Sequence, residues 1–239
     1  MPDIPRMLAA AHEVKHLFDS SLLACKVNDR GEARVSATIC LTIAEQFAAT
    51  LCLVEAGFSS LAPILVRSML EGLADLLNLV KDARYLGQMR FENARNDVNL
   101  FTEYTHDPEM QEDKEAIANL REWSAKAAPL RAELAAEGFR PQSVVDKFKK
   151  AGILQNYVAY RVFCSFAHNQ LTTLIGRHGG NFELRYHNEA PPELTASTLN
   201  VAVSILCRAV ETLPRFTSVS AGEMDQAVKA ANEIWSKLN

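Results

Sequence analysis

The sequence has little of what marks secreted, membrane-bound or nucleotide-hydrolysing proteins. Its five cysteines lie far apart, form no Cys-x-x-Cys pair and are odd in number. Such cysteines favour buried free thiols in a reducing compartment over a disulfide framework or a cysteine zinc site. The chain also has no Gly-rich phosphate-binding loop and no nucleophile elbow. We therefore expect a cytoplasmic protein that holds no metal and no cofactor.

A strong charge of either sign is also absent. The 239 residues carry 25 basic and 29 acidic side chains, a formal net charge of −4, so any nucleic-acid binding has to come from a local patch. The first six residues lack the basic start and apolar core of a signal peptide. The most apolar stretch, residues 35–54, contains Glu45, which favours a core helix over a membrane span. We expect no association with a membrane.

Apolar residues recur at helical spacing along nearly the whole chain, and no convincing set of alternating strands is present. The pattern predicts a single all-α domain over residues 1–239, a bundle of about eight or nine helices with a long charged hairpin in its middle. Residues 28–31 are expected to form a turn, and residues 182–186 a short strand or an extended loop. The expected helices cover residues 4–25, 33–55, 61–80, 84–104, 107–136, 143–151, 154–175, 193–216 and 221–238.

Two polar constellations interrupt the apolar helical stretches. On the helix of residues 61–80, a polar stripe at positions i, i+4, i+8 and i+11 consists of Arg67, Glu71, Asp75 and Asn78. On the helix of residues 154–175, a stripe with the same spacing consists of Tyr157, Arg161, Ser165 and His168.

A weaker stripe of Thr38, Thr42 and Glu45 lies on the helix of residues 33–55. Because polar groups are costly in an apolar setting without partners, we expect the three stripes to meet in the middle of the bundle. Arg67 and Glu71 should then lie within reach of Ser165 or His168.

These groups have a structural and a functional interpretation. In the structural one, Arg67 and Glu71 form an ion pair within a hydrogen-bond network that fixes the register of the helices. In the functional one, a cationic arginine, a titratable histidine and a hydroxyl converge where a phosphate can bind. The sequence leaves both open.

The residues G-F-x-x-x-x-P-x-L-V-R-S-M-L-E-G from Gly57, together with Tyr160-x4-Ser165-x2-His168-Asn169, resemble those of a bacterial family known as domain-of-unknown-function family 5677. The resemblance covers about three quarters of the chain and is weakest in the charged middle. It implies an all-helical intracellular protein, and it supplies no activity.

A looser resemblance is to the HEPN (higher eukaryote and prokaryote nucleotide-binding) helical domains, because Arg161-x6-His168 fits their R-x4–6-H pattern. Many HEPN domains are metal-independent endoribonucleases of toxin or phage-defence systems. The resemblance implies His168 as the acid/base group and Arg161 as the phosphate stabiliser, although Val162 stands where a polar residue is common. The alternative is a non-enzymatic bundle that binds a small ligand or a partner and whose polar core is structural.

From both lines of argument, the predicted catalytic residues are His168, Arg161 and Glu71, and the predicted substrate-binding residues are Arg67, Ser165, Tyr160, Tyr157 and Asn169.

Two further expectations concern the surface. We expect a homodimer, with candidate interface helices at residues 199–210 and 224–235. Lys147, Lys149 and Lys150 form the only compact basic cluster, which favours either RNA phosphate contacts or a solvated face. A histidine pair at i, i+4, His12 and His16, is expected to lie on the surface.

Overall fold

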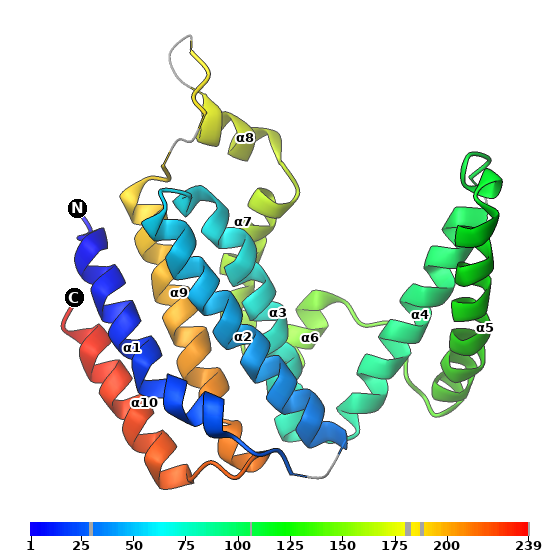
Figure 1. Ribbon diagram of the computed structural model, residues 1–239, viewed down its shortest axis with the longest axis horizontal. Helices are drawn as coiled ribbons and strands as arrows, with labels where there is room; N and C mark the ends of the chain where they lie inside the picture. Colours follow the sequence, from blue (N-terminus) through cyan, green and yellow to red (C-terminus); the bar gives the residue numbers. More distant parts are fainter. Residues whose placement is uncertain (29–30, 106, 180–182, 187–188, 239) are drawn as a thin grey trace. The chain divides into compact units, whose positions relative to one another are not determined.

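The chain is all-α in a computed structural model that describes residues 1–28, 31–105, 107–179, 183–186 and 189–238 (Figure 1). Within these ranges there are ten α-helices, four short 3₁₀ helices and no strand, which confirms the predicted fold class. The α-helices are α1 Ile4–Ala24, α2 Gly31–Glu55, α3 Ala62–Lys81, α4 Tyr85–Thr105, α5 Lys114–Ala136, α6 Val144–Ala151, α7 Tyr157–Ala167, α8 Leu171–His178, α9 Pro192–Val210 and α10 Ala221–Ser236.

One of the expected helices is divided into two helices in the structure. The helix predicted over residues 154–175 ends at Ala167 and restarts at Leu171, which makes α7 and α8. The break falls at Asn169, whose φ of 49° makes it the one non-glycine residue of the described chain in the left-handed region. Asparagine tolerates that conformation better than most side chains. The apolar periodicity continues through the break, so it could not reveal this turn.

The described residues form two compact units, one of residues 1–80 and 147–239 and one of residues 81–146. The smaller unit is the predicted charged hairpin, in which α4 and α5 pack along one another. Gly87 permits a close approach there, because a Cβ at this position would lie 2.4 Å from Cζ of Phe139. The Arg84 guanidinium lies 5.5 Å from the centroid of the same ring. The single domain expected for residues 1–239 stays a prediction.

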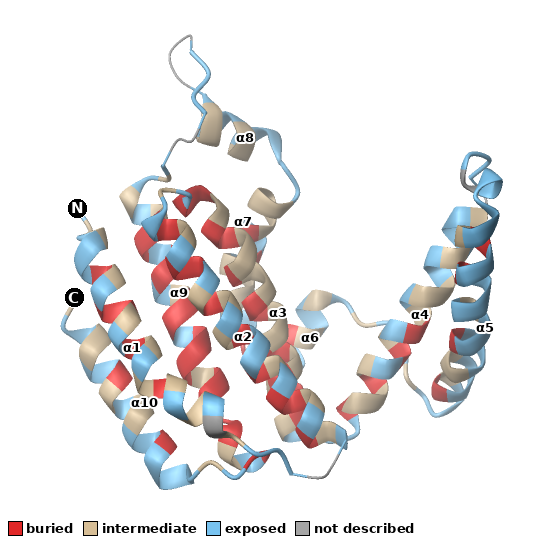
Figure 2. Ribbon diagram, in the orientation of Figure 1, coloured by how far each residue is buried: buried red, intermediate tan, exposed pale blue. Residues whose placement is uncertain are grey.

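The larger unit has α9 at its centre. Helices α1 and α2 both pack on α9, and α10 packs on α1 (Figure 1). Most of α9 is buried, as Figure 2 shows, and Leu199, Ala202 and Ile205 have no exposed surface. Because its apolar side chains are buried within the protein, α9 is a core helix, which leaves residues 199–210 little surface for a partner, and the dimer with its interface stays a prediction.

Local signals in the sequence set several helix ends. The Asp3 carboxylate accepts a hydrogen bond of 3.1 Å from the backbone N–H of Arg6 and caps α1, as N-cap residues do. Gly57, expected to end the second helix, has a φ of 79°, and the Phe58 N–H donates to the Leu53 carbonyl at 2.7 Å. A left-handed residue followed by such a bond is the common glycine stop of helices.

Two segments, Gly31–Glu55 and Pro192–Arg215, are long and apolar enough to span a membrane by length and composition. Core helices of soluble proteins meet the same criterion, and both segments pack within the larger unit. The cytoplasmic location and the absence of membrane association stay predictions. Asp29 and Arg30 of the predicted turn at residues 28–31 lie outside the described residues. Phe182 of the predicted strand at residues 182–186 also lies outside them, and Leu184 of that segment pairs with Gly179 in an isolated bridge.

Candidate functional site

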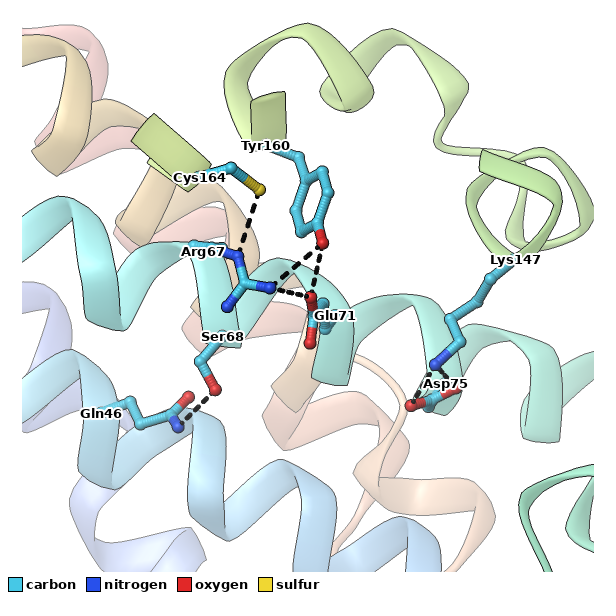
Figure 3. Close-up of polar contacts among 8 residues, drawn as sticks. All are labelled: Gln46, Arg67, Ser68, Glu71, Asp75, Lys147, Tyr160 and Cys164. Atoms are coloured by element: carbon cyan, nitrogen blue, oxygen red, sulfur yellow. Dashed lines mark hydrogen bonds and ion pairs between the residues drawn. The ribbon is translucent and has the colours of Figure 1, made fainter. Parts of the chain in front are cut away.

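The polar stripe of α3 meets α7 through its first two members. Glu71 Oε1 lies 3.0 Å from Nη2 of Arg67 and accepts a hydrogen bond of 2.7 Å from the Tyr160 hydroxyl. The Arg67 guanidinium donates to Cys164 Sγ at 3.2 Å and to the Tyr160 oxygen at 3.3 Å (Figure 3). The pairing expected with Ser165 or His168 is made instead with Tyr160 and Cys164.

Burial and pairing set the electrostatics of this network. Burial and the hydrogen bond to Glu71 raise the pKa of Tyr160 well above its ordinary value of 10, so the phenol stays protonated. For Arg67, burial lowers the pKa, but the bonds to Cys164 and Tyr160 and the charge of Glu71 outweigh it and raise the value. Arg67 therefore stays cationic, and its side chain is only 23% exposed. The network is a satisfied ion pair with a neutral phenol.

Tyr157 belongs to an aromatic cluster that positions Tyr160. The two tyrosine rings stack with centroids 5.7 Å apart, and the buried Phe148 ring lies 5.2 Å from Tyr160 and 5.9 Å from Tyr157. These packed rings fix the phenol that contacts Glu71. Tyr157 and Tyr160 thus pack and hold the network together, and their predicted binding of substrate stays a prediction.

The other two residues of the α3 stripe, Asp75 and Asn78, contact α6. The Asp75 carboxylate lies 2.9 Å from Nζ of Lys147 (Figure 3). Asn78 donates to the Lys147 carbonyl at 3.2 Å. Both carboxylate and ammonium are more than two thirds buried. One lysine of the predicted basic cluster is therefore held in an ion pair, which supports the structural reading of that residue.

The third polar stripe does not reach the network. On α2, the Thr38 and Thr42 hydroxyls donate to carbonyls of their own helix at 2.9 and 3.0 Å, and Glu45 is exposed. The expectation that three stripes meet in the middle of the bundle is therefore wrong. Gln46 connects the helices instead, with its amide donating to the Ser68 hydroxyl at 2.9 Å (Figure 3).

Sequence reasoning passed over Gln46, Ser68 and Cys164 as members of the site. The Arg67-Ser68 pair and the place of Cys164 beside the α7 stripe were the available signals.

Ser165, Arg161 and His168 have other surroundings than predicted. The Ser165 hydroxyl donates to the Val162 carbonyl of its own helix at 2.6 Å. His168 follows the last residue of α7 and its backbone N–H bonds to the Cys164 carbonyl at 3.0 Å. Both His168 and Arg161 are exposed, and among the described residues no hydrogen bond or ion pair engages either side chain. Asn169 is exposed as well and its side chain makes no hydrogen bond there either, so three of the predicted site residues are unpaired within the described ranges.

Exposed apolar side chains lie on α7, on α8 and just before α7. Val158 is 72% exposed and Val162 48% exposed on α7, and Leu171 is 71% exposed at the start of α8. Leu154 and Ile175 are exposed as well. We call these five residues the α7–α8 apolar face. Clustered apolar exposure of this kind marks interaction surfaces more often than isolated exposed residues do.

The histidine pair of the first helix, expected only to lie on the surface, belongs to a motif with the spacing of a zinc site. Residues 12–16 read H-E-V-K-H, which matches the H-E-x-x-H pattern of zinc proteases. In the structure, His12 Nε2 contacts Glu55 Oε1 at 2.5 Å, whereas His16 Nδ1 lies 3.2 Å from Asp19 and is exposed. Within the described ranges, no group of three or more His, Cys, Asp or Glu side chains is arranged to hold a metal ion.

Comparison with known proteins gives one match. The model of a family of unknown function, DUF5677, matches residues 34–184, which include both constellations. Neither the curated proteins nor the solved structures give a significant match.

Proposed function

The chain belongs to the family of unknown function DUF5677, and we propose that it is a HEPN-like, metal-independent endoribonuclease of the toxin or phage-defence kind that works as a homodimer. The observation that carries the proposal is the exposure of Arg161 on α7 and of His168 just past its end, neither of which has a side-chain hydrogen bond or ion pair within the described residues. The polar side chains beside them make contacts within the chain instead, namely those of Arg67, Glu71, Asp75, Asn78, Tyr160 and Ser165. A cation and a titratable imidazole kept free of partners are available to a substrate.

The spacing of the two residues suits a phosphodiester. Seven residues correspond to about 10 Å of rise along an α-helix and to nearly two whole turns, so the two positions lie close to one face. His168 stands just past the last residue of α7, and its backbone N–H still makes the helical bond to the Cys164 carbonyl, so the helical spacing extends to it. A long arginine side chain and an imidazole can approach one phosphate group from this separation.

The proposed reaction is transfer of the phosphoryl group within RNA. The neutral His168 imidazole accepts the proton of a 2′-hydroxyl as the 2′-oxygen attacks the adjacent phosphorus. The bond from phosphorus to the 5′-oxygen breaks, and the protonated His168 of the second copy donates its proton to that oxygen. The products are a 2′,3′-cyclic phosphate and a 5′-hydroxyl. Proton transfer of this kind contributes about 10²–10⁴-fold.

Arg161 supplies the electrostatic part. Its guanidinium donates to the non-bridging oxygens of the phosphate, whose negative charge grows as the 2′-oxygen attacks. Removing one such donor typically costs about 10²–10³-fold in rate. The two roles need only residues of this chain.

A second copy is expected on the α7–α8 apolar face. Burying Val158, Val162 and Leu171 removes a substantial apolar area from water, at roughly 25 cal/mol per Å². A two-fold axis through this face also brings two copies of Arg161 and His168 together, and it thereby supplies one histidine as base and one as acid.

Glu71, predicted to be catalytic, has a positioning role in this proposal, and so does Arg67. Both lie in the paired network with Tyr160, which holds α7 against α3 and so fixes the helix that presents Arg161. The alternative function, a binding bundle with a structural polar core, agrees with the same network. The two functions differ in the role of the exposed Arg161 and His168, which cleave RNA in the first and have no catalytic role in the second.

The test is RNA cleavage by the purified full chain in EDTA. We expect wild type to cut mixed RNAs to cyclic phosphate ends, and both His168→Ala and Arg161→Gln to lose at least 100-fold in rate with unchanged melting temperatures. His16→Ala, an exposed histidine on α1, is the matched control and should cut normally. Wild type that leaves mixed RNAs uncut, with and without Mg²⁺, would overturn the proposal, as would His168→Ala that fails to fold.

A further inference from the structure

A cavity of about 260 Å³ lies in the larger unit beside the break between α7 and α8. Its walls come from the end of α7, one side of α8, the start of α9 and the 3₁₀ helix Ser59–Leu61. Ligand sites for drug-sized molecules measure about 300–1,000 Å³, so this cavity suits a smaller group. His168 and Asn169 belong to the connection between two of its lining residues, Phe166 and Thr172.

The cavity combines an apolar lining with two opposite charges. Phe166, Pro191 and Leu194 provide apolar surface, including one aromatic ring. Arg177 and Glu189 line the same cavity, yet no ion pair within 4 Å joins them among the contacts of the described residues. The Nε of Arg177 is buried and has no hydrogen-bond partner among these residues. An unsatisfied buried donor is costly, so a ligand that brings an acceptor is stabilising here.

We propose that this cavity binds a guanine base of the RNA substrate, an inference that rests on the proposed function. Guanine presents two adjacent acceptors, O6 and N7, and the arginine fork matches them with two parallel hydrogen bonds. Its N1–H and N2–H groups are two adjacent donors, which a carboxylate such as that of Glu189 accepts. Phe166 and Leu194 cover the faces of the planar ring, as apolar and aromatic side chains do for unstacked RNA bases.

The other bases fit this pair of charges less well. Adenine has an amino group beside N7, so the arginine fork finds one acceptor on that edge. Cytosine and uracil are smaller and leave more of the cavity unfilled. A bound guanine would lie next to the connection that carries His168, which links recognition of the base to the proposed cleavage of a neighbouring phosphate.

The test is binding of 3′-mononucleotides to the full chain, measured by calorimetry and by NMR chemical-shift changes. We expect guanosine 3′-monophosphate to bind at least tenfold more tightly than the adenosine, cytidine and uridine compounds. Arg177→Lys and Glu189→Gln should each weaken this binding at least tenfold, because each removes one half of the recognition. Glu193→Gln, on the first turn of α9, and Arg208→Lys, later on α9, are matched controls and should bind as wild type does.

A filling variant gives an independent readout. Gly176 lines the cavity, and a Cβ at this position would have no neighbour within 4 Å. Gly176→Leu therefore adds a side chain to the cavity without a clash at Cβ, and it favours the helix because glycine is a poor helix former. We expect it to fold with an unchanged or higher melting temperature and to lose guanosine 3′-monophosphate binding.

The outcomes separate this inference from the proposed function. Guanine binding that depends on Arg177 and Glu189 supports the base site even if no RNA is cut, and in that case the nuclease proposal fails alone. RNA cleavage without base preference and without nucleotide binding leaves the nuclease in place and overturns the base site. Tighter binding of free glycine or glutamate than of guanosine 3′-monophosphate, lost in the same variants, would also overturn it, in favour of an amino-acid site.

Discussion

At the scale of single residues, the Arg67 network shows a charged group inside an apolar helix that finds partners through Nε and Nη2. Its arginine contacts Glu71, Tyr160 and Cys164. Each partner comes from the same helix or from α7, so the network fixes where α7 lies on α3. Arg161 and His168 lie outside this network, and their side chains are therefore available to bind a ligand or transfer a proton.

Loss of the Glu71 carboxylate should destabilise the protein. Glu71→Ala leaves Arg67 and Tyr160 without their common acceptor, and an orphaned buried polar group typically costs about 1–3 kcal/mol. Urea unfolding should show this loss in the free energy of unfolding, and Glu71→Gln, which keeps an oxygen acceptor, should lose less. Glu122→Ala, which breaks an exposed pair with Lys126, should unfold as wild type does.

A Glu71→Ala protein that is as stable as wild type but inactive on RNA would contradict this assignment. Glu71 would then be the catalytic residue that its sequence context predicts, and the network would be part of the reacting site.

Two buried thiols should make the protein sensitive to alkali. Burial and the charge of Cys25 raise the pKa of Cys40 from 9.0 to about 12, and burial and Glu211 raise that of Cys207 to about 11. Between pH 9 and pH 11 the unfolded thiols lose protons that the folded thiols keep, so the free energy of unfolding falls as pH rises. The limiting slope is about 1.4 kcal/mol per pH unit for each thiol.

Urea unfolding from pH 8 to pH 11 tests this dependence. Cys40→Ala should flatten the decline relative to wild type, and alkylation of the native protein should modify the exposed Cys52 well before Cys40 or Cys207. An equally steep decline in Cys40→Ala would assign the alkali sensitivity to other groups.

At the scale of elements, the break between α7 and α8 decides how His168 is presented. His168 still makes the helical bond to the Cys164 carbonyl, and the turn at Asn169 directly after it ends α7 there, within the connection between the cavity-lining residues Phe166 and Thr172. The positive φ of Asn169 gives this residue a structural role in addition to its predicted contact with substrate.

Substitutions at Asn169 should separate these roles. Asn169→Gly should be as stable as wild type, because glycine adopts the left-handed conformation without strain. Asn169→Val should lose about 1–2 kcal/mol, since a branched side chain clashes with the backbone there. Thermal and urea unfolding measure both. If Asn169→Gly is stable yet loses RNA cleavage, the asparagine side chain contacts substrate as predicted.

At the scale of the whole molecule, we expect the α7–α8 apolar face to bind a second copy of the chain. Light scattering should give the mass of a dimer, and Val158→Asp should convert it to a monomer of 26.5 kDa, because a buried unpaired carboxylate opposes association. Leu23→Asp, on an equally exposed apolar residue of α1, is the control and should stay dimeric.

The same variants test the link between assembly and activity. The Val158→Asp monomer should fold and should lose RNA cleavage, since it has no second His168 to act as acid. A wild-type chain that is monomeric at all concentrations would contradict the shared site directly.

The sequence by itself determined the all-α class, the long charged hairpin and most helix boundaries, because apolar periodicity, N-caps such as Asp3 and stops such as Gly57 are local signals. It also singled out Arg67, Glu71 and Tyr160, three of the polar groups that meet between α3 and α7. These signals act within a few residues of the chain, so a single sequence carries them.

Tertiary structure alone decided which polar groups pair. Whether Arg67 meets Ser165 or Cys164 depends on the rotation of α7 against α3, and that rotation follows from the packing of Phe148, Tyr157 and Tyr160. The same holds for α9, whose apolar pattern fits a core and an interface equally well until its neighbours cover it. Periodicity gives each helix its faces, but only the contacts between helices determine what each face touches.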